Sequence, residues 1–412
     1  MTNKIELLAP AGDLDKLKTA IDFGADAVYF GAEMFSLRAS SGNMSVADIT
    51  KGLEYAHERS KKGYMALNIF PHNEDIIPLR KYLNEIKDIK VDAFIVSDPG
   101  VIYLLKEIIP DAEIHLSTQA NMTNYETAKF WSSLGVKRLV LARELTFEEI
   151  ESMLENIPCD TELEAFVHGA MCISYSGRCL LSNFMIERDA NRGQCAHPCR
   201  WNYSLVEEKR PGEYYPIEED DRGTYIMNSR DLCMIEHIPE LMNSGIKSFK
   251  IEGRMKSMYY VATVVRAYRL AIDSYCSDPD NFEFDDYWSN ELEKASHREF
   301  TTGFYFHKPD NKDQNYLTSS YTRTFDFAGV IKKYEKDTGL TVIEQRNKIS
   351  IGDKIEVFGP EVGHFEYVLE EMYNEDGEAI ESAPHAQQIV KINFGREFKP
   401  GYILRKEKGS GE

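Results

Sequence analysis

The stretch E-A-F-V-H-G-A-M-C-I-S-Y-S-G-R-C-L-L-S, residues 164–182, begins as an apolar strand pattern and ends among cysteines. Five of the chain's seven cysteines lie within 62 residues that start in this stretch: Cys172, Cys179, Cys195, Cys199 and Cys233. Ordinary buried cysteine explains one or two thiols, but it does not explain five in so short a segment. We therefore expect these thiols to build one site, with the rest of the chain arranged around it.

Disulfides and structural zinc are two possible uses of such thiols. Disulfides form in oxidising compartments, but the start of the chain, M-T-N-K-I-E-L-L-A-P, lacks the apolar run of a signal peptide. We therefore expect free thiols and a cytoplasmic protein. Structural zinc takes thiols in pairs about two to four residues apart. Cys195 and Cys199 satisfy this spacing, whereas Cys172 and Cys179 do not.

An iron–sulfur cluster is the third possible use. It is commonly held by four thiolates, which can be scattered widely along the chain. Three glycines beside the cysteines would let the backbone approach an inorganic core closely: Gly169, Gly177 and Gly193. The spacing therefore favours a cluster over zinc.

Outward from this stretch, short apolar segments alternate with amphipathic ones. The expected strands are residues 5–9, 27–31, 64–70, 93–97, 113–117, 138–142, 163–168 and 248–252. Helical patterns include residues 13–23, 45–62, 77–88, 125–134, 146–155 and 257–275. Alternating strands and helices indicate an α/β protein with a parallel sheet, and eight such strands predict a closed (β/α)8 TIM-like barrel. No G-x-G-x-x-G follows the first strand, so a dinucleotide-binding Rossmann fold lacks its main signal.

The connection before the eighth strand, residues 170–247, is too long for one helix. It holds the cysteines and a run, residues 203–227, with the pattern of a β-hairpin that has a charged tip. Loops at the C-terminal end of barrel strands build the functional sites of this fold. We therefore expect this cysteine-rich insertion at the C-terminal mouth of the barrel.

Polar residues at or near strand ends are expected at the same mouth. We expect catalytic roles for four of them: Glu164, His168, Lys250 and Arg143. We expect substrate contacts from seven others: Arg38, Asn68, Asp98, Gln119, Asn121, Glu252 and Arg254. Structural roles stay open, because Asn68 or Asp98 could cap a following helix. Likewise, Glu164 could pair with Lys250 inside the barrel, and His168 could be a core residue.

From about residue 324 the pattern changes to alternating runs separated by Gly, Asp and Pro turns, which indicates a small all-β barrel. We place the catalytic barrel at residues 1–307, a linker at residues 308–323 and the C-terminal domain at residues 324–412. No apolar run approaches the roughly 18 residues of a membrane span.

The formal net charge of −20 argues against a globally basic nucleic-acid surface. Contact with RNA is local, however, so a confined basic face remains compatible with it. We expect such a face on the C-terminal domain and on the helix that carries Arg266 and Arg269. Its members in the domain would be Lys332, Lys333, Arg346, Lys348, Lys391, Arg396, Lys399, Arg405 and Lys406.

The run from Glu164 to Cys172, followed by G-R-C-L-L-S at residues 177–182, resembles the signature of peptidase family U32. The resemblance extends from L-L-A-P-A-G, residues 7–12, to the C-terminal domain. Despite the family's name, its better understood members resemble iron–sulfur proteins that support hydroxylation of a tRNA wobble uridine, a ribosomal RNA cytidine or a quinone precursor. The resemblance implies a 4Fe–4S cluster and a link to prephenate as a co-substrate. The implied ligands are Cys172, Cys179, Cys195 and Cys233, with Cys199 as the rival of the last.

One barrel followed by one C-terminal β-domain is similar to the tRNA-acting members of the family. The resemblance thus implies an enzyme that forms 5-hydroxyuridine at the wobble position, with tRNA as its partner and no membrane. Ribosomal RNA and a quinone precursor are the alternative substrates, and a peptidase is the alternative activity. The peptidase has weak support, because A-H-E-R-S at residues 56–60 lacks the second histidine of a zinc protease and no G-x-S-x-G is present. A Cys172 nucleophile with His168 as its base stays open.

Overall fold

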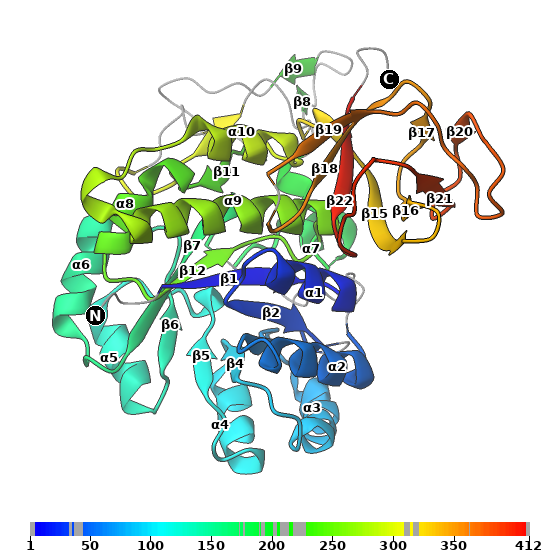
Figure 1. Cartoon of the computed structure of the whole chain (residues 1–412). Coiled ribbons are helices and arrows are strands. Elements are labelled where there is room, and N and C mark those ends of the chain that lie inside the picture. Colours follow the sequence, from blue (N-terminus) through cyan, green and yellow to red (C-terminus); the bar gives the residue numbers. More distant parts are fainter. Residues whose placement is uncertain are drawn as a thin grey trace.

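The structure is a computed structural model. It describes residues 5–32, 35–36, 44–172, 174–175, 178–188, 190, 194–200, 204–206, 214–216, 228–308, 314–315, 321–361 and 363–408. Eight parallel strands follow one another around a barrel (Figure 1). They are β1 (Glu6–Ala11), β2 (Ala27–Gly31), β3 (Lys62–Leu67), β4 (Ala93–Val96), β5 (Ile114–Leu116), β6 (Arg138–Val140), β7 (Glu162–Ala170) and β12 (Ser248–Ile251). The last of these, β12, pairs with both β1 and β7 and closes the ring, which confirms the predicted TIM-like barrel.

Helices cover the outside of the barrel (Figure 1). They are α1 (Leu14–Asp22), α2 (Val46–His57), α3 (Asn73–Ile86), α4 (Pro99–Ile108), α5 (Tyr125–Ser133), α6 (Phe147–Asn156), α8 (Ile238–Asn243), α9 (Met258–Ser277) and α10 (Asp286–Lys294). Short polar side chains cap many of their N-termini, as Asp13, Ser45 and Thr146 do by accepting a backbone N–H of the first turn. The helical patterns of the sequence did not single out α4 and α10.

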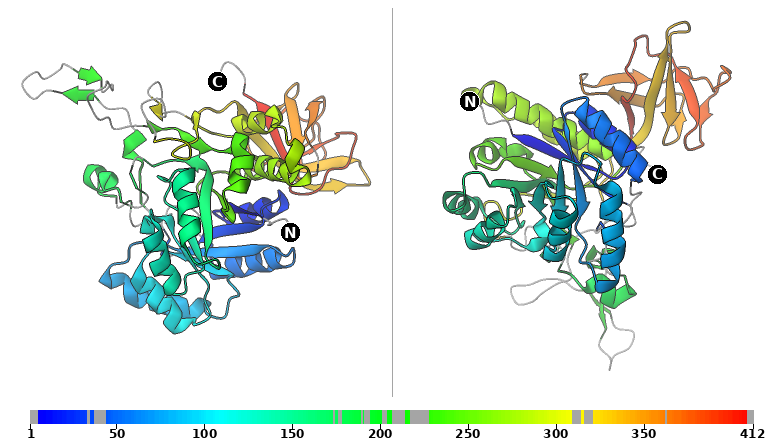
Figure 2. Two further views of the ribbon diagram at one scale, coloured as in Figure 1. Left: turned by 90° about the vertical axis from the view of Figure 1, so that its left-hand side faces the viewer. Right: turned by 90° about the horizontal axis from the view of Figure 1, so that it is seen from below.

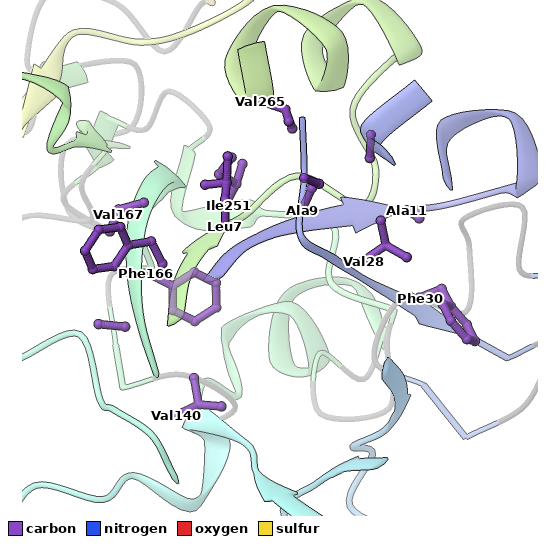
Figure 3. Close-up of a cluster of buried hydrophobic side chains, with 14 of the residues drawn as sticks. Leu7, Ala9, Ala11, Val28, Phe30, Val140, Phe166, Val167, Ile251 and Val265 are labelled. Atoms are coloured by element: carbon purple, nitrogen blue, oxygen red, sulfur yellow. The ribbon is translucent and has the colours of Figure 1, made fainter. Parts of the chain in front are cut away.

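Side chains alternate between the two faces of each barrel strand. Leu7, Ala9 and Ala11 of β1 point outward, and Val265 of α9 approaches them from above (Figure 3). A smaller apolar cluster fills part of the barrel interior: Leu8, Ala27, Tyr29, Tyr64, Ala66, Ala93 and Ile95. The barrel is thus a packed core, as in other barrels of this kind, and its C-terminal end is left to build a site.

The insertion between β7 and β12 is attached to the mouth of the barrel. Its strand β11 (Asp231–Cys233) pairs antiparallel with the end of β7, and β13 (Phe300–Thr301) pairs with β11. The strands β8 (Ser204–Val206) and β9 (Tyr214–Pro216) form the predicted hairpin and project from the barrel (Figure 2). The insertion also contains α7 (Leu181–Ile186) and β10 (Asn228–Ser229), which pairs with β14 (Gln314–Asn315).

The C-terminal domain is an antiparallel sheet in the order β19-β18-β22-β15-β16-β21. Its strands are β15 (Phe325–Glu335), β16 (Leu340–Gln345), β18 (Lys354–Phe358), β19 (Phe365–Val368), β21 (Ile389–Ile392) and β22 (Ile403–Glu407). A further pair joins β17 (Ile349–Ser350) to β20 (Ser382–Ala383). The all-β prediction is confirmed, with a half-barrel in which no described pairing joins the edge strands β19 and β21.

The two domains share part of their hydrophobic core. Val330, Phe358 and Ile403 of the C-terminal domain pack into the core of the barrel, while the domain also has a core of its own. Within the described part of the chain, no helix is long and apolar enough to cross a bilayer.

Candidate functional site

A cavity of about 250 Å³ lies at the C-terminal mouth of the barrel. Its floor and walls come from strand ends and from the cysteine-rich insertion. Six of the predicted site residues line it: Asn68, Gln119, Arg143, Lys250, Glu252 and Arg254. Four cysteines line it as well: Cys172, Cys179, Cys195 and Cys199. The structure therefore brings the two predicted groups, thiols and strand-end polar residues, to one place.

The four thiols reach the cavity from separate parts of the insertion, and all of them are free of disulfide bonds. The hydroxyl of Ser182 in α7 accepts a hydrogen bond from the backbone N–H of Ala196 at 3.1 Å, which ties the segment of Cys195 to the segment of Cys179. The backbone N–H of His197 lies 3.4 Å from the sulfur of Cys195. Such N–H contacts to sulfur are one of the means by which proteins tune iron–sulfur clusters.

Four free thiols on one cavity fit the donor set of a cluster that takes four thiolates. Among the described residues, no group of three or more His, Cys, Asp or Glu side chains is arranged to hold a metal ion. The 4Fe–4S cluster therefore stays a prediction, and the residues that would hold it are those four cysteines.

Cys233 lies apart from the cavity lining. It sits on β11 opposite His168 of β7, and the hydroxyl of Tyr268 lies 3.9 Å from its sulfur. Burial raises the pKa of the Cys233 thiol to about 12 in the absence of a metal. This geometry favours Cys199 over Cys233 as the fourth ligand.

The cavity is positively charged in a chain that is strongly negative overall. Among the residues that the structure describes, four cationic side chains line it, Arg143, Lys250, Arg254 and Lys256, against one carboxylate, Glu252. Such a local field attracts anions even when the net charge is −20.

Two of these cations are held in fixed positions. Arg143 donates to the carbonyl of Ala170 at 2.6 Å, and its guanidinium lies 4.0 Å from the centre of the Phe166 ring. Arg254 donates to the hydroxyl of Ser36 at 3.4 Å. A β-carbon at Gly31 would lie 2.3 Å from the hydroxyl of Ser36 and 2.6 Å from a guanidinium nitrogen of Arg254, so a larger residue there would displace both side chains. Guanidinium groups held in this way suit carboxylates and phosphates.

Gln119 offers the cavity a neutral hydrogen-bond donor. It lies on the short 3-10 helix η1 (Thr118–Ala120) after β5, and its side-chain oxygen accepts from the hydroxyl of Ser117 at 3.2 Å. Its buried amide nitrogen makes no hydrogen bond within the described residues. An unsatisfied buried donor is costly, so a ligand oxygen in the cavity would stabilise it.

Two predicted site residues have structural positions instead. Asp98 caps α4 by accepting from the N–H of Val101 at 3.0 Å, and it lies outside the cavity lining. Asn121 adopts a positive φ of 52° and donates to the carbonyl of Gln119 at 2.8 Å, so it shapes the turn beneath Gln119. Arg38 lies outside the described residues.

His168 is a third predicted site residue that lies outside the cavity lining. It is 2 % exposed and packs among the rings of Tyr260, Tyr268 and Phe300, at centroid distances of 5.5 to 6.0 Å. Burial lowers its pKa to about 3, so the ring is neutral. Its place among these rings, outside the cavity lining, gives it no contact with the cavity, so the geometry favours the core role over that of a catalytic base.

The cavity also contains residues that the sequence did not indicate. Lys256 and Tyr321 close one side of it, beside Tyr29 of β2, with the ammonium of Lys256 3.9 Å from the centre of the Tyr321 ring. Tyr321 falls within the predicted linker, where nothing in the local pattern distinguishes it.

Asp98→Ala tests the structural role of this residue. Loss of the N-cap should destabilise the protein by about 1 kcal/mol, measured by urea denaturation. The cavity should function as before, because the carboxylate of Asp98 bonds to the helix and not to the site. A variant of normal stability that has lost activity would contradict this assignment.

Comparison with known proteins places the chain in a family. The model of peptidase family U32 matches residues 12–315, and the model of the peptidase family U32 C-terminal domain matches residues 323–405. The chain is 42% identical over 408 residues to tRNA hydroxylation protein P1 of Bacillus subtilis (strain 168), covering 99% of this chain and 96% of that protein. It is 38% identical to tRNA hydroxylation protein P of Escherichia coli (strain K12), covering 99% of this chain and 98% of that protein. It is also 34% identical to a protein of Porphyromonas gingivalis (strain ATCC BAA-308 / W83) named collagenase, covering 94% of each chain. With the family model matched over most of its length, this chain belongs to peptidase family U32.

Proposed function

We propose that this protein hydroxylates tRNA, and more narrowly that it forms 5-hydroxyuridine at the wobble position with a 4Fe–4S cluster in the cavity. The observation that carries the proposal is the meeting of four thiols with a cationic wall at the barrel mouth. Two relatives that align over almost their whole length are named tRNA hydroxylation proteins. A tRNA substrate also implies that the protein works in the cytoplasm.

Different residues of the cavity would bind different parts of the substrate. When bound, the cluster would supply one-electron chemistry next to the substrate. Arg143 and Arg254 would hold an anionic group, either an RNA phosphate or a carboxylate of a co-substrate such as prephenate. The amide of Gln119 would donate to a carbonyl oxygen of the base. Reaching these groups requires a loop base to leave its stack, as bases of single-stranded loops do when proteins recognise them.

A peptidase is the second candidate, because the Porphyromonas relative is named collagenase. The conceivable nucleophile is Cys172 with His168 as its base. His168 is a neutral core residue, and no hydrogen bond joins it to Cys172 within the described residues. A thiol nucleophile needs an adjacent base, so the geometry favours the hydroxylation proposal.

The proposal is tested by mass spectrometry of tRNA nucleosides from cells that lack this protein. In cells that encode no related protein, nucleosides derived from 5-hydroxyuridine should disappear. They should return when the full-length chain is supplied. Unchanged levels in cells without a related protein would overturn the tRNA proposal. Digests of ribosomal RNA from the same cells would then show whether a cytidine is the substrate.

A further inference from the structure

Charged side chains are stacked inside the barrel directly beneath the cavity. They come from four strands: Glu6 of β1, Arg138 of β6, Glu164 of β7 and Lys250 of β12. Arg138 forms ion pairs with Glu6 and, at 3.4 Å, with Glu164. Lys250 lies 2.5 Å from the other carboxylate oxygen of Glu164. We call these four side chains the barrel charge ladder.

The lower end of the ladder is fixed by neighbouring side chains. Glu6 accepts hydrogen bonds from the hydroxyls of Tyr64 at 2.6 Å and Ser248 at 2.8 Å. Arg138 is 5 % exposed and also pairs with Glu162 at 2.7 Å. Each charged side chain below Lys250 therefore has partners, of which only Glu162 is exposed.

Only the Lys250 end of the ladder reaches the cavity. Glu164 has no exposed surface, and its two oxygens are taken by Lys250 and Arg138. Burial acts to raise the pKa of Glu164, but the charges of Lys250 and Arg138 bring it below its usual value, so the group is a carboxylate. A carboxylate in this position has no contact through which to exchange a proton with a substrate.

The ammonium of Lys250 is restrained on several sides. Glu164 lies beneath it, the ring centre of Tyr29 lies at 4.4 Å and that of Phe166 at 5.5 Å. A free lysine is a compact, strongly hydrated charge on a flexible stem. In this barrel the carboxylate and the two rings replace part of the water and fix the charge against the cavity.

We propose that Lys250 is the charge which the cavity presents to a substrate oxygen, and that Glu164 is a positioning residue which acts only through Lys250. A fixed ammonium stabilises negative charge on that oxygen without having to reorganise. A buried ion pair stabilises a fold no better than apolar packing does, so positioning explains why four strands contribute charges here. This inference rests on the proposed function in one respect, namely that the reaction takes place in this cavity.

A double-mutant cycle separates positioning from direct participation. The variants are Lys250→Met, Glu164→Gln and the two together, supplied to cells that lack the protein. Lys250→Met should lower the initial rate of tRNA hydroxylation by about 100-fold, and Glu164→Gln by about tenfold. In the Lys250→Met background, Glu164→Gln should lower the rate no further, because the group through which it acts is already gone. Lys250→Arg, which keeps the charge, should retain part of the rate.

Folding is followed separately by thermal melting. Each single variant should lower the melting temperature. The double variant should lower it by less than the sum of the two single decreases, because both buried partners are then removed together. Glu291→Gln is the matched control. It alters a buried carboxylate that is paired with Arg405 at 2.6 Å, far from the cavity lining, so it should lower the melting temperature without changing the rate per folded molecule.

Two results would overturn the inference. If Glu164→Gln lowers the rate equally with and without Lys250, Glu164 acts on the substrate independently. If the melting shifts simply add, the pair is not coupled in solution. If the wild-type chain restores no hydroxylation, the proposed function is wrong. The melting temperatures of the single and double variants would still decide whether Glu164 holds Lys250 in place.

Discussion

Cys172→Ala and Cys179→Ala are each expected to abolish iron binding and to remove tRNA hydroxylation. Both thiols line the same cavity as Cys195 and Cys199, and loss of one of four thiolate ligands should destabilise the cluster. Protein purified without oxygen should be brown when wild type, with iron and acid-labile sulfide in near-equal amounts. Both signals should be missing from the two variants.

Two other cysteines provide matched controls for this experiment. Cys159 and Cys276 are exposed and lie outside the cavity lining, so their alanine variants should keep full iron and activity. Stoichiometric zinc without sulfide in the wild-type protein would end the cluster proposal.

The fourth ligand is decided by Cys199→Ala and Cys233→Ala. Cys199 lines the cavity, whereas Cys233 lies outside the cavity lining, beside the hydroxyl of Tyr268. We therefore expect Cys199→Ala to lose iron and Cys233→Ala to keep it, in contrast to the assignment that the family resemblance implies. The opposite pattern would restore Cys233 as the ligand.

Strand positions were predictable because each barrel strand is a short apolar run between polar turns. The expected strand at residues 27–31 coincides with β2, and the one at residues 248–252 differs from β12 by a single residue. The clustering of polar residues at the mouth was predictable for the same reason, since the C-terminal ends of parallel strands meet at one edge.

Individual roles were less predictable, because they depend on contacts between distant segments. Alternation along β7 would turn His168 inward, like Glu164 and Phe166. The pairing of β7 with β12 instead shifts register between Lys250 and Ile251, and the end of β7 pairs with β11. His168 consequently lies among aromatic rings from α9 and β13, which no local pattern reveals.

Most members of the expected basic face of the C-terminal domain have carboxylate neighbours, and the face itself stays a prediction. Seven of them form ion pairs with carboxylates: Lys332, Lys333, Arg346, Lys391, Lys399, Arg405 and Lys406. Arg266 donates to the carbonyl of Gly359, and Arg269 pairs with Asp26 and Asp273. Cations that are neutralised by neighbours contribute little to phosphate binding. The alternating pattern of a strand and the composition of the domain show where its basic residues lie, but they do not show which carboxylates pair with them.

The same contacts make the C-terminal domain a structural part of the barrel. Arg405 has no exposed side-chain surface and bonds to Glu291 of α10 at 2.6 Å and Glu356 of β18 at 2.7 Å. The ring of Phe358 packs edge-on against Phe23 of the barrel at 5.9 Å. Removing residues 324–412 would expose this apolar surface and leave Glu291 without Arg405. A truncated chain is therefore a poor test of RNA binding, and single substitutions are preferable.

Arg405→Ala is accordingly expected to destabilise the whole protein by about 3–5 kcal/mol, because removing one partner leaves buried carboxylates uncompensated. Burial acts to raise the pKa of Glu291, but Arg405 and Lys294 hold it below its usual value, so the carboxylate is charged in the wild type and loses its main stabilising partner when Arg405 is removed. The measurement is urea denaturation followed by circular dichroism, in which barrel helices and C-terminal strands should unfold together. Lys399→Ala is the control, since it breaks an exposed ion pair with Glu361 and should leave the midpoint unchanged. Two separate transitions in the wild type, or an Arg405→Ala variant as stable as the Lys399→Ala control, would show that the domains are independent and would make the truncated barrel a valid test again.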